Sequence, residues 1–310
     1  MAETDIILSL VKLFIMIVPG YVLANKNIID EHQSKGVTSI ITCLTWPCLI
    51  VASLQREFSV GLCINMGILA AVMVAELAVA CLMSVIIGRC FKLEKNVRYL
   101  MMFMLMFGST GFMGIPVCNA LYGSEGVFYA ALAESVQNVF VFTLGLIMMG
   151  RSAGRPAELS VKNFINPGFV SVVAGLGLFF ARITLPNVIA VPVETIGATT
   201  SPLVMLVVGY QLGRIGLREL FSDIRIYVLS AVKLIVTPLI FLVLVRLLFP
   251  GMNVLLRSII IETAMPVAAC TTIFTRQYDG DVEFATKGVM LSTLLSVITL
   301  TGFALIVEMI

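Results

Sequence analysis

Charged side chains are scarce in this sequence. They make up 12% of its 310 residues, against 59% hydrophobic residues, whereas soluble domains average about 25% charged residues. There is no basic tail, low-complexity tract or aromatic-interleaved basic patch, so nothing indicates a nucleic-acid partner. The composition predicts an all-α polytopic membrane protein, with residues 1–310 forming a single integral membrane unit.

Residue types typical of metal sites and catalysis are also rare. The one histidine, His32, lies in a polar segment, and the seven cysteines show no C-x-x-C spacing, so we expect neither a metal site nor a disulfide framework. The motifs H-E-x-x-H and G-x-S-x-G are missing, which argues against an enzyme. There is no Walker motif either, so ATP bound to this chain cannot drive transport. No cofactor is expected, although Na⁺ or H⁺ remains open as a coupling ion.

Long apolar runs are plentiful by contrast. Runs of about 20 apolar residues mark membrane-spanning helices. Ten are predicted, near 6–24, 36–54, 62–88, 99–121, 126–149, 167–185, 193–213, 225–249, 255–276 and 285–307. The first run lacks a positive n-region and an A-x-A site, so we interpret it as a span and not as a cleaved signal peptide.

Lysine and arginine are unevenly divided between the two sides of these spans. Loops after odd-numbered spans carry 14 of them: Lys26, Lys35, Arg89, Lys92, Lys95, Arg98, Arg151, Arg155, Lys162, Arg214, Arg218, Arg225, Arg276 and Lys287. The opposite side carries four, namely Arg56, Arg182, Arg246 and Arg257. Basic loops face the cytoplasm. We therefore expect a multi-pass protein of the plasma (inner) membrane with both termini outside.

The two halves of the chain echo each other. The motif Thr45-x-Pro47 recurs as Thr200-x-Pro202 at an offset of 155, and the segments after the fourth and ninth spans match at an offset of 156. Five spans per half is an odd number, so the second half enters the membrane from the opposite side. The sequence thus predicts a 5+5 inverted repeat, 1–150 and 160–310, an arrangement that exposes one site alternately to either face.

Two prolines lie within spans 4 and 9, Pro116 in FGSTGFMGIPVCNALYG and Pro266 in ETAMPVAACTT. Proline removes a backbone donor and disrupts a helix. Freed backbone at membrane depth is tolerated only inside protein or beside a water-filled cavity, and half-helix N-termini suit anions. We expect two broken helices that cross at a substrate site. Two ordinary proline kinks are the alternative.

Polar groups near these prolines and the repeated Thr-x-Pro motif are candidates for contacting a carboxylate. They are Ser109, Thr110, Gly111, Asn119, Asn138, Thr45, Thr200, Glu262, Thr263 and Thr271. The hydroxyl groups alternatively bond their own backbone or a neighbouring helix.

Glu76, Lys233 and Glu262 are ionisable residues inside predicted spans, where charge is costly and by default functional. Glu76 in span 3 and Lys233 in span 8 are separated by 157 residues, which places them at equivalent positions of the two repeats. We expect them, with Glu262, to take part in ion or proton coupling. A purely structural pair, or a Lys233 that snorkels to the membrane surface, is the alternative.

The segments GSTGFMGIPVCNALYGSEGVFYAAL and ETAMPVAACTTIFTRQYDGDVEFATKGVMLSTLLSVITL resemble the auxin efflux carrier family, and the resemblance extends over essentially the whole chain. It implies a ten-helix fold similar to bile-acid sodium symporters and sodium/proton antiporters. Spans 1, 2, 6 and 7 would form a scaffold, and spans 3–5 and 8–10 a transport domain that moves like an elevator. A homodimer through the scaffold is left open.

The chain departs from that family at three places. Ser109 stands where the family often has asparagine, Val267 where it often has a second proline, and the loop 150–166 is short. These departures favour the prokaryotic branch of the family. Resemblance to that branch implies that the substrates are small organic acids such as malate or malonate. We therefore predict a secondary or facilitated transporter of small organic anions in the lipid bilayer. A receptor that binds an organic acid without transport and an exporter of auxin-like aromatic acids are the alternatives.

Overall fold

The computed structural model describes residues 3–91, 94–156, 165–214 and 223–309, and throughout these ranges the regular structure is helical apart from one isolated β-bridge. Lys92, Lys162 and Arg218, counted above among the cytoplasmic charges, lie outside the described residues. The chain divides into two compact units. Unit 1 is 1–69, 111–135 and 165–215, and unit 2 is 70–110, 136–164 and 216–310.

Unit 1 is built mainly from the N-terminal helices and from the helices between residues 165 and 215. Its elements are α1 (Glu3–Ile15), α2 (Ile17–Asn25), α3 (Glu31–Ile40), the π-helical turn η1 (Ile41–Thr45), α4 (Trp46–Leu54), α9 (Pro167–Ala181), α10 (Asn187–Ala198) and α11 (Thr200–Gly213). Side chains dictate several starts. Asp30 and Gln33 form a capping box at α3, and Asn166 caps α9, whose first residue is Pro167. Both are standard helix-start signals.

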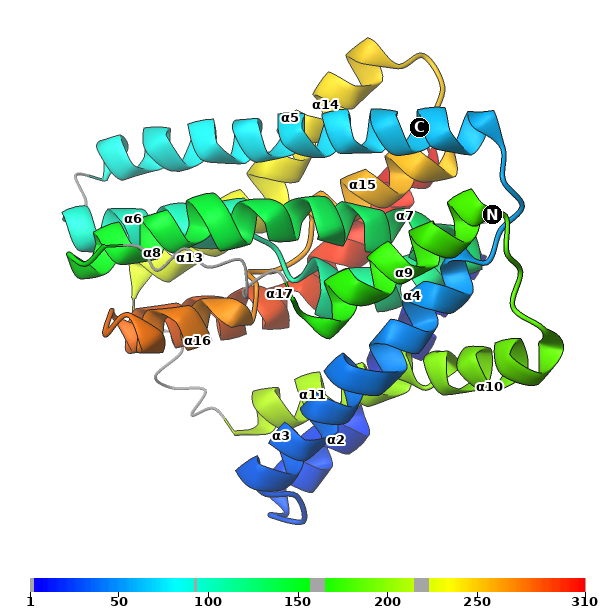
Figure 1. Ribbon diagram of the computed structural model, residues 1–310. Helices are drawn as coiled ribbons and strands as arrows, with labels where there is room; N and C mark the ends of the chain where they lie inside the picture. Colours follow the sequence, from blue (N-terminus) through cyan, green and yellow to red (C-terminus); the bar gives the residue numbers. More distant parts are fainter. Residues whose placement is uncertain (1–2, 92–93, 157–164, 215–222, 310) are drawn as a thin grey trace. The chain divides into compact units, whose positions relative to one another are not determined.

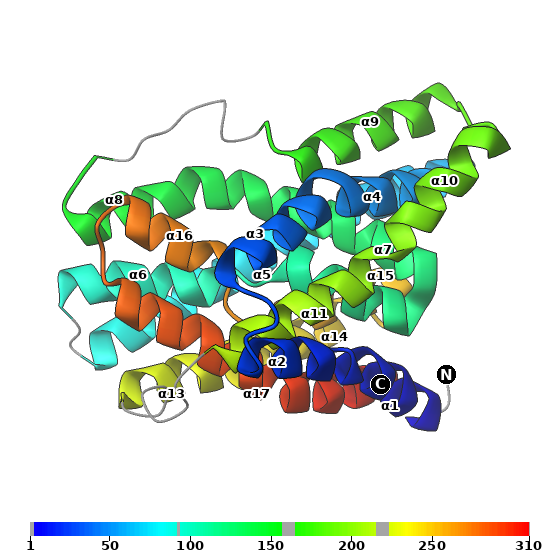
Figure 2. The ribbon, with the colours of Figure 1, turned by 90° about the horizontal axis from the view of Figure 1, so that it is seen from below.

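The closest helix packing in unit 1 is between α2 and α11, which lie side by side in Figures 1 and 2. A Cβ on Gly20 would lie 2.0 Å from the Leu206 carbonyl oxygen, and a Cβ on Gly209 would lie 2.0 Å from that of Ile17. Backbone therefore meets backbone, which only small residues permit at membrane helix interfaces. The neighbouring helix α4 contacts both α9 and α10.

Unit 2 contains helices from the middle of the chain and most of the C-terminal third. Its elements are α6 (Lys95–Met106), the π-helical turn η3 (Val141–Gly145), α8 (Leu146–Ala153), α13 (Ile224–Ala231), the π-helical turn η5 (Val232–Val236), α14 (Thr237–Leu248), α15 (Val254–Thr263), α16 (Cys270–Gln277) and α17 (Val282–Met309). Helix α6 packs on α8, and α17 packs on both α13 and α16; Figure 1 shows α16 beside α17 and Figure 2 shows α13 beside it.

Three elements contribute residues to both units: α5 (Val60–Cys90), the π-helical turn η2 (Thr110–Gly114) and α7 (Ile115–Phe140). Helix α7 is not one straight helix. Gly123 has φ 60° and ψ −147°, a conformation that is essentially confined to glycine. This residue separates the predicted spans 99–121 and 126–149.

Seven helical segments in the described residues are long and apolar enough to cross a membrane. They are Thr4–Asn25, Glu31–Leu54, Val60–Cys90, Thr110–Ala153, Asn187–Gly213, Ile224–Leu248 and Val282–Met309, with Pro167–Ala181 as a shorter apolar helix. The prediction of an all-α multi-span membrane protein is confirmed. Predicted spans 4 and 9 do not appear in this set as continuous helices, because both are interrupted. The count of ten stays a prediction.

Unit 1 holds the predicted spans 1, 2, 6 and 7, together with residues 111–135. Most of the remaining predicted spans lie in unit 2. Whether these units act as scaffold and transport domain stays a prediction, as does the division into repeats 1–150 and 160–310.

Candidate functional site

The helix that was predicted to break at Pro116 breaks earlier. Helix α6 ends at Met106, residues 107–109 are non-helical, and the helix resumes at Thr110. Phe107 is extended, with φ −106° and ψ 118°. Pro116 lies just after the π-helical turn η2 (Thr110–Gly114), as the second residue of α7, so the helix continues through it. The interruption therefore centres on Gly108.

The Gln137 side chain makes hydrogen bonds that replace the backbone hydrogen bonds missing at this interruption. Its carboxamide nitrogen donates to the Gly108 carbonyl at 3.0 Å and to the Thr110 hydroxyl at 2.8 Å, and the Gly108 N–H donates back to its oxygen at 3.4 Å. Gln137 is buried. A side-chain amide here replaces two bonds that a continuous helix would have made, because a buried backbone group without a partner is costly.

The second interruption lies between α15 and α16 and contains Pro266. It is hydrogen-bonded to the first one. The Ser109 N–H donates to the Pro266 carbonyl at 2.7 Å, and the Ala268 N–H donates to the Phe107 carbonyl at 3.1 Å, forming an antiparallel bridge between Gly108 and Val267. The sequence-predicted pair of broken helices is thus joined within unit 2.

Ser292 of α17 completes the second interruption, because its hydroxyl accepts the Val267 N–H at 3.1 Å. The backbone donors of Phe107, Gly108, Ser109, Val267 and Ala268 all have protein partners. We expected the interruption to leave backbone groups open to a substrate. These particular groups are instead used to hold the two interruptions together.

A buried positive charge lies against the same interruption. Lys233, in the π-helical turn η5, has 1% of its surface exposed. Its ammonium donates to the Leu105 carbonyl at 3.1 Å, one of the last carbonyls of α6, where a cation interacts favourably with the helix dipole. A Cβ on Gly108 would lie 3.4 Å from the Lys233 Nζ atom. The ammonium does not snorkel to the surface.

Glu76 of α5 is buried, as Lys233 is, with 3% of its surface exposed. Among the described residues its carboxylate has no lysine or arginine nitrogen within 4.0 Å, so the two are not a direct salt bridge. Burying charges without close pairing costs several kcal/mol per ion. The arrangement marks this part of unit 2 as a candidate site.

The remaining predicted residues of unit 2 lie around the interruptions in different ways. The hydroxyls of Thr263 and Thr271 donate to the backbone of their own segments, at Ile259 and Ala268, over 2.9 and 2.6 Å. This is the local bonding that had been the alternative for these residues. Glu262 is buried in α15. Asn138 is half-buried in α7, and Ser109 is half-buried at the interruption.

Two predicted threonines lie in unit 1, at the repeated Thr-x-Pro motif. Thr45 ends η1 and Thr200 begins α11, elements that contact each other. Both are buried, and within the described part of the chain their hydroxyl oxygens have no hydrogen-bond partner. The same holds for the Trp46 indole nitrogen. Buried polar atoms of this kind are rare and call for a partner such as water or substrate.

Gly111 of unit 1 packs against this tryptophan. A Cβ on Gly111 would lie 2.4 Å from two atoms of the Trp46 ring and 2.9 Å from a Glu134 carboxylate oxygen. Phe112 meets the same ring edge-on, with centroids 6.1 Å apart. Gly111 therefore permits a close approach of side chains. Asn119 is half-buried in α7.

Comparison with known proteins decides the family. A sequence model of the family described as membrane transport protein matches residues 5–160 and 155–304. The chain belongs to this family, the auxin efflux carriers. The predicted family is confirmed, and so is the prediction that the protein is a transporter and not an enzyme.

Relatives of this transporter are distantly similar to it in sequence. An uncharacterized transporter of Methanothermobacter thermautotrophicus is 23% identical over 97% of each chain. An uncharacterized transporter of Methanocaldococcus jannaschii is 24% identical over 99% of this chain and all of its own. A Rhizobium meliloti protein, provisionally named a malonate transporter, is 22% identical over 65% of each chain.

Three residues of this auxin efflux carrier family member were missed as site candidates. Gln137, Ser292 and Trp46 are not among the predicted site residues, although Trp46 is the middle residue of the repeated Thr45-x-Pro47 motif. An amide in the middle of an apolar run is a signal that could have identified Gln137. The sequence pattern gives no comparable signal for the position of Ser292 beside Val267.

Proposed function

We propose that this auxin efflux carrier family member is a secondary transporter of small organic anions, dicarboxylates such as malate or malonate. The observation that carries the proposal is the Lys233 ammonium, which is buried beside the paired helix interruptions. A buried ammonium attracts a carboxylate strongly, because little water screens it. The uncharged hydroxyls and amides nearby would orient the anion, as in other mostly apolar sites with few polar groups.

The paired interruptions also support a crossover within an inverted repeat. Gly108 and Val267, which form the β-bridge, are 159 residues apart, near the offsets of 155 to 157 found in the sequence. Discontinuous helices at equivalent positions of two repeats are the usual location of transporter sites near the bilayer midplane. We propose that the substrate binds there and is exposed alternately to either side by an elevator-type movement.

Malonate is the first substrate to test because a relative carries that name. That relative matches only 65% of this chain. Its name is therefore a reason to test malonate first, but it is not evidence that this chain transports malonate. Malate tests a longer dicarboxylate. Indole-3-acetate tests the alternative of an auxin-like aromatic acid.

The experiment is uptake of labelled malonate, malate or indole-3-acetate into proteoliposomes that contain the purified chain. We expect saturable malonate or malate uptake. Lys233→Met should lower it about 10-fold or more, because a hydrogen bond to a charged group contributes about 1.5–3 kcal/mol. The matched control is Lys12→Met, since Lys12 is an exposed lysine in the apolar helix α1.

Several results would count against this proposal. Equal losses in both lysine variants would remove the case for Lys233, and uptake of indole-3-acetate alone would favour the aromatic-acid exporter. Binding of a dicarboxylate without any flux would favour the receptor. Imposed Na⁺ and H⁺ gradients, applied separately, identify the coupling ion, and Glu76→Gln tests whether Glu76 takes part in proton coupling.

A further inference from the structure

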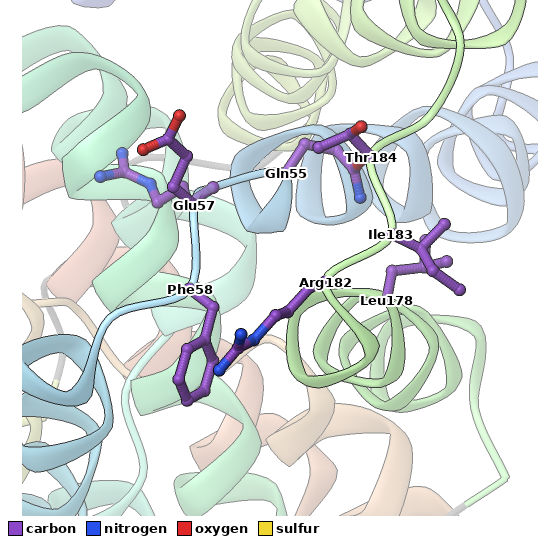
Figure 3. A pocket seen from close by; sticks show the side chains of 8 residues that line it. Gln55, Glu57, Phe58, Leu178, Arg182, Ile183 and Thr184 are labelled. Atoms are coloured by element: carbon purple, nitrogen blue, oxygen red, sulfur yellow. The ribbon is translucent and has the colours of Figure 1, made fainter.

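Unit 1 has a cavity of about 260 Å³ where α4 and α9 end. Its walls come from the ends of these helices and the segments that follow them, and Figure 3 shows the side chains that line it. Gln55, Arg56 and Phe58 follow α4, Leu178 lies in the last turn of α9, and Arg182 and Ile183 follow α9. The wall is therefore part cationic and part apolar. Nothing in the proposed transport mechanism uses this cavity.

Both arginines are held by aromatic rings and not by acids. The Arg182 guanidinium lies 4.6 Å from the centroid of the Phe58 ring, as Figure 3 shows, and that of Arg56 lies 5.1 Å from the Phe128 centroid. In the described part of the chain, neither has a carboxylate within 4.0 Å. Glu57 also lines the cavity, but its carboxylate points away from Arg182 in Figure 3.

Stacking on an aromatic ring orients a guanidinium while leaving its N–H groups for other partners. The Arg182 side chain makes no hydrogen bond to any described residue, whereas Arg56 uses Nε on the Ser53 carbonyl and Nη2 on the Ser124 hydroxyl. The planar fork of donors on arginine matches the oxygens of a carboxylate or phosphate. Two such groups line the cavity beside a single carboxylate, that of Glu57, and this excess of positive charge favours an oxyanion.

A third donor lines the same cavity. The Gln55 side-chain oxygen accepts the Leu185 N–H at 2.9 Å, which fixes the orientation of the amide because only the oxygen can accept this bond. The amide nitrogen is then a donor, and it is buried without a hydrogen-bond partner among the described residues. An unused buried donor of this kind calls for a ligand or water.

The backbone of Arg182 gives independent support. It has φ 57° and ψ 33°, in the left-handed region, at the C-terminal cap of α9. Glycine usually occupies this cap position, because a Cβ is strained there. In the part of the chain that the structure describes, the other non-glycine residues with positive φ are Asn27 and Asp279, types that tolerate this conformation. A strained arginine at a glycine position indicates that its side chain is required.

We propose that Arg56, Arg182 and the Gln55 amide nitrogen form a binding site for an oxyanion, a carboxylate or phosphate group. The apolar wall of Phe58, Leu178 and Ile183 would receive the apolar part of the same molecule. Two sources carry this chemistry, a soluble organic anion and the head group of an anionic lipid. Phe180 and Ile183, each 54% exposed, make the lipid source accessible from the bilayer.

The test is thermal unfolding of the purified full chain in an uncharged detergent. Inorganic phosphate, phosphatidylglycerol and phosphatidylcholine, whose zwitterionic head group has no net charge, are added separately. We expect a rise in Tm of roughly 5 °C at a ligand concentration about 100 times the Kd. A rise with phosphatidylglycerol and not phosphatidylcholine identifies the lipid source, and a rise with phosphate identifies the soluble source.

The double variant Arg56→Gln/Arg182→Gln should lose this rise in Tm, while Arg246→Gln should keep it. Arg246 is the matched control, because it is an exposed arginine at the end of α14, outside the cavity. No rise with any anion, or the same rise in the double variant, would overturn the proposal.

A second variant keeps the test valid if the double variant folds poorly. Arg182→Gly removes the guanidinium and also relieves the strain of the Cβ. We expect a small rise in Tm for the ligand-free protein, together with loss of the ligand-dependent rise. A lower Tm without ligand, or a ligand-dependent rise that persists, would show that Arg182 is kept for packing and not for binding.

Discussion

Gln137→Leu is the substitution that most directly tests how the two interruptions are held. Leucine preserves approximate size and apolar contacts but removes both the donor and the acceptor of the carboxamide. The Gly108 N–H and carbonyl then lose their partner. The bridge to Val267 keeps Gly108 in place, so these groups cannot easily find another one.

The size of the effect follows from the geometry of these bonds. A buried polar group left without a partner costs about 1–3 kcal/mol. The bond to the Gly108 carbonyl is 3.0 Å long, but the bond from its N–H is 3.4 Å long and therefore weak. We expect Gln137→Leu to lower the free energy of unfolding by about 2–4 kcal/mol. This exceeds the average of about 0.6 kcal/mol for polar contacts in membranes.

The assay is equilibrium unfolding of the purified chain by a denaturing detergent in mixed micelles. The matched control is Gln211→Leu, since Gln211 is half-buried in α11 and its side chain makes no hydrogen bond within the described residues. We expect that control to change stability by about 0.5 kcal/mol or less. If the two variants agree within that margin, Gln137 does not hold the interruption.

Two further predictions concern packing and charge. Gly209→Ala should lower the free energy of unfolding by about 1–3 kcal/mol, because its Cβ would lie 2.0 Å from the Ile17 carbonyl oxygen. In the control Gly36→Ala in α3, the added Cβ has nothing within 4 Å, and the free energy of unfolding should rise by up to about 1 kcal/mol. Changes of the same sign in the two variants would contradict the packing described for Gly209. The hydrogen bonds from Arg225 hold the pKa of Asp223 below its ordinary value, so the ionised group stabilises the fold at neutral pH and this contribution is lost as pH falls through the lowered pKa. Asp223→Asn should therefore be less stable by about 0.5 kcal/mol at pH 7, with the difference fading below about pH 4; a difference that persists at pH 2 in thermal unfolding would exclude this pair as its cause.

Much of the helical organisation could be predicted from apolar runs alone. The predicted run 62–88 corresponds to α5, and the run 285–307 to α17. The helix boundaries in the structure differ from the predicted ones where a capping motif was overlooked. The run predicted from 36 begins at Glu31 because Asp30 and Gln33 cap the helix. A cap of this type is readable in sequence, so this error was avoidable.

The interruptions show where pattern reasoning failed. Pro116 was the obvious helix breaker in its span, yet the helix runs through it from η2 into α7, and the break is at Gly108. The position of a break depends on which tertiary partners can replace the lost bonds. Here they are Gln137, Pro266 and Ala268. Such partners are distant in sequence, and no local pattern identifies them.

The bond between Lys233 and Leu105 has a consequence for how the protein is made. A lysine at the centre of an apolar helix raises the free energy of membrane insertion by about 2.5–3.5 kcal/mol. The acceptor for Lys233 is the carbonyl of Leu105, 128 residues earlier in the chain. During synthesis from the N-terminus this carbonyl enters the membrane first. The segment Ile224–Leu248 can therefore complete its insertion against a partner that is already in place, and the second half of the chain, inserted alone, would lack it.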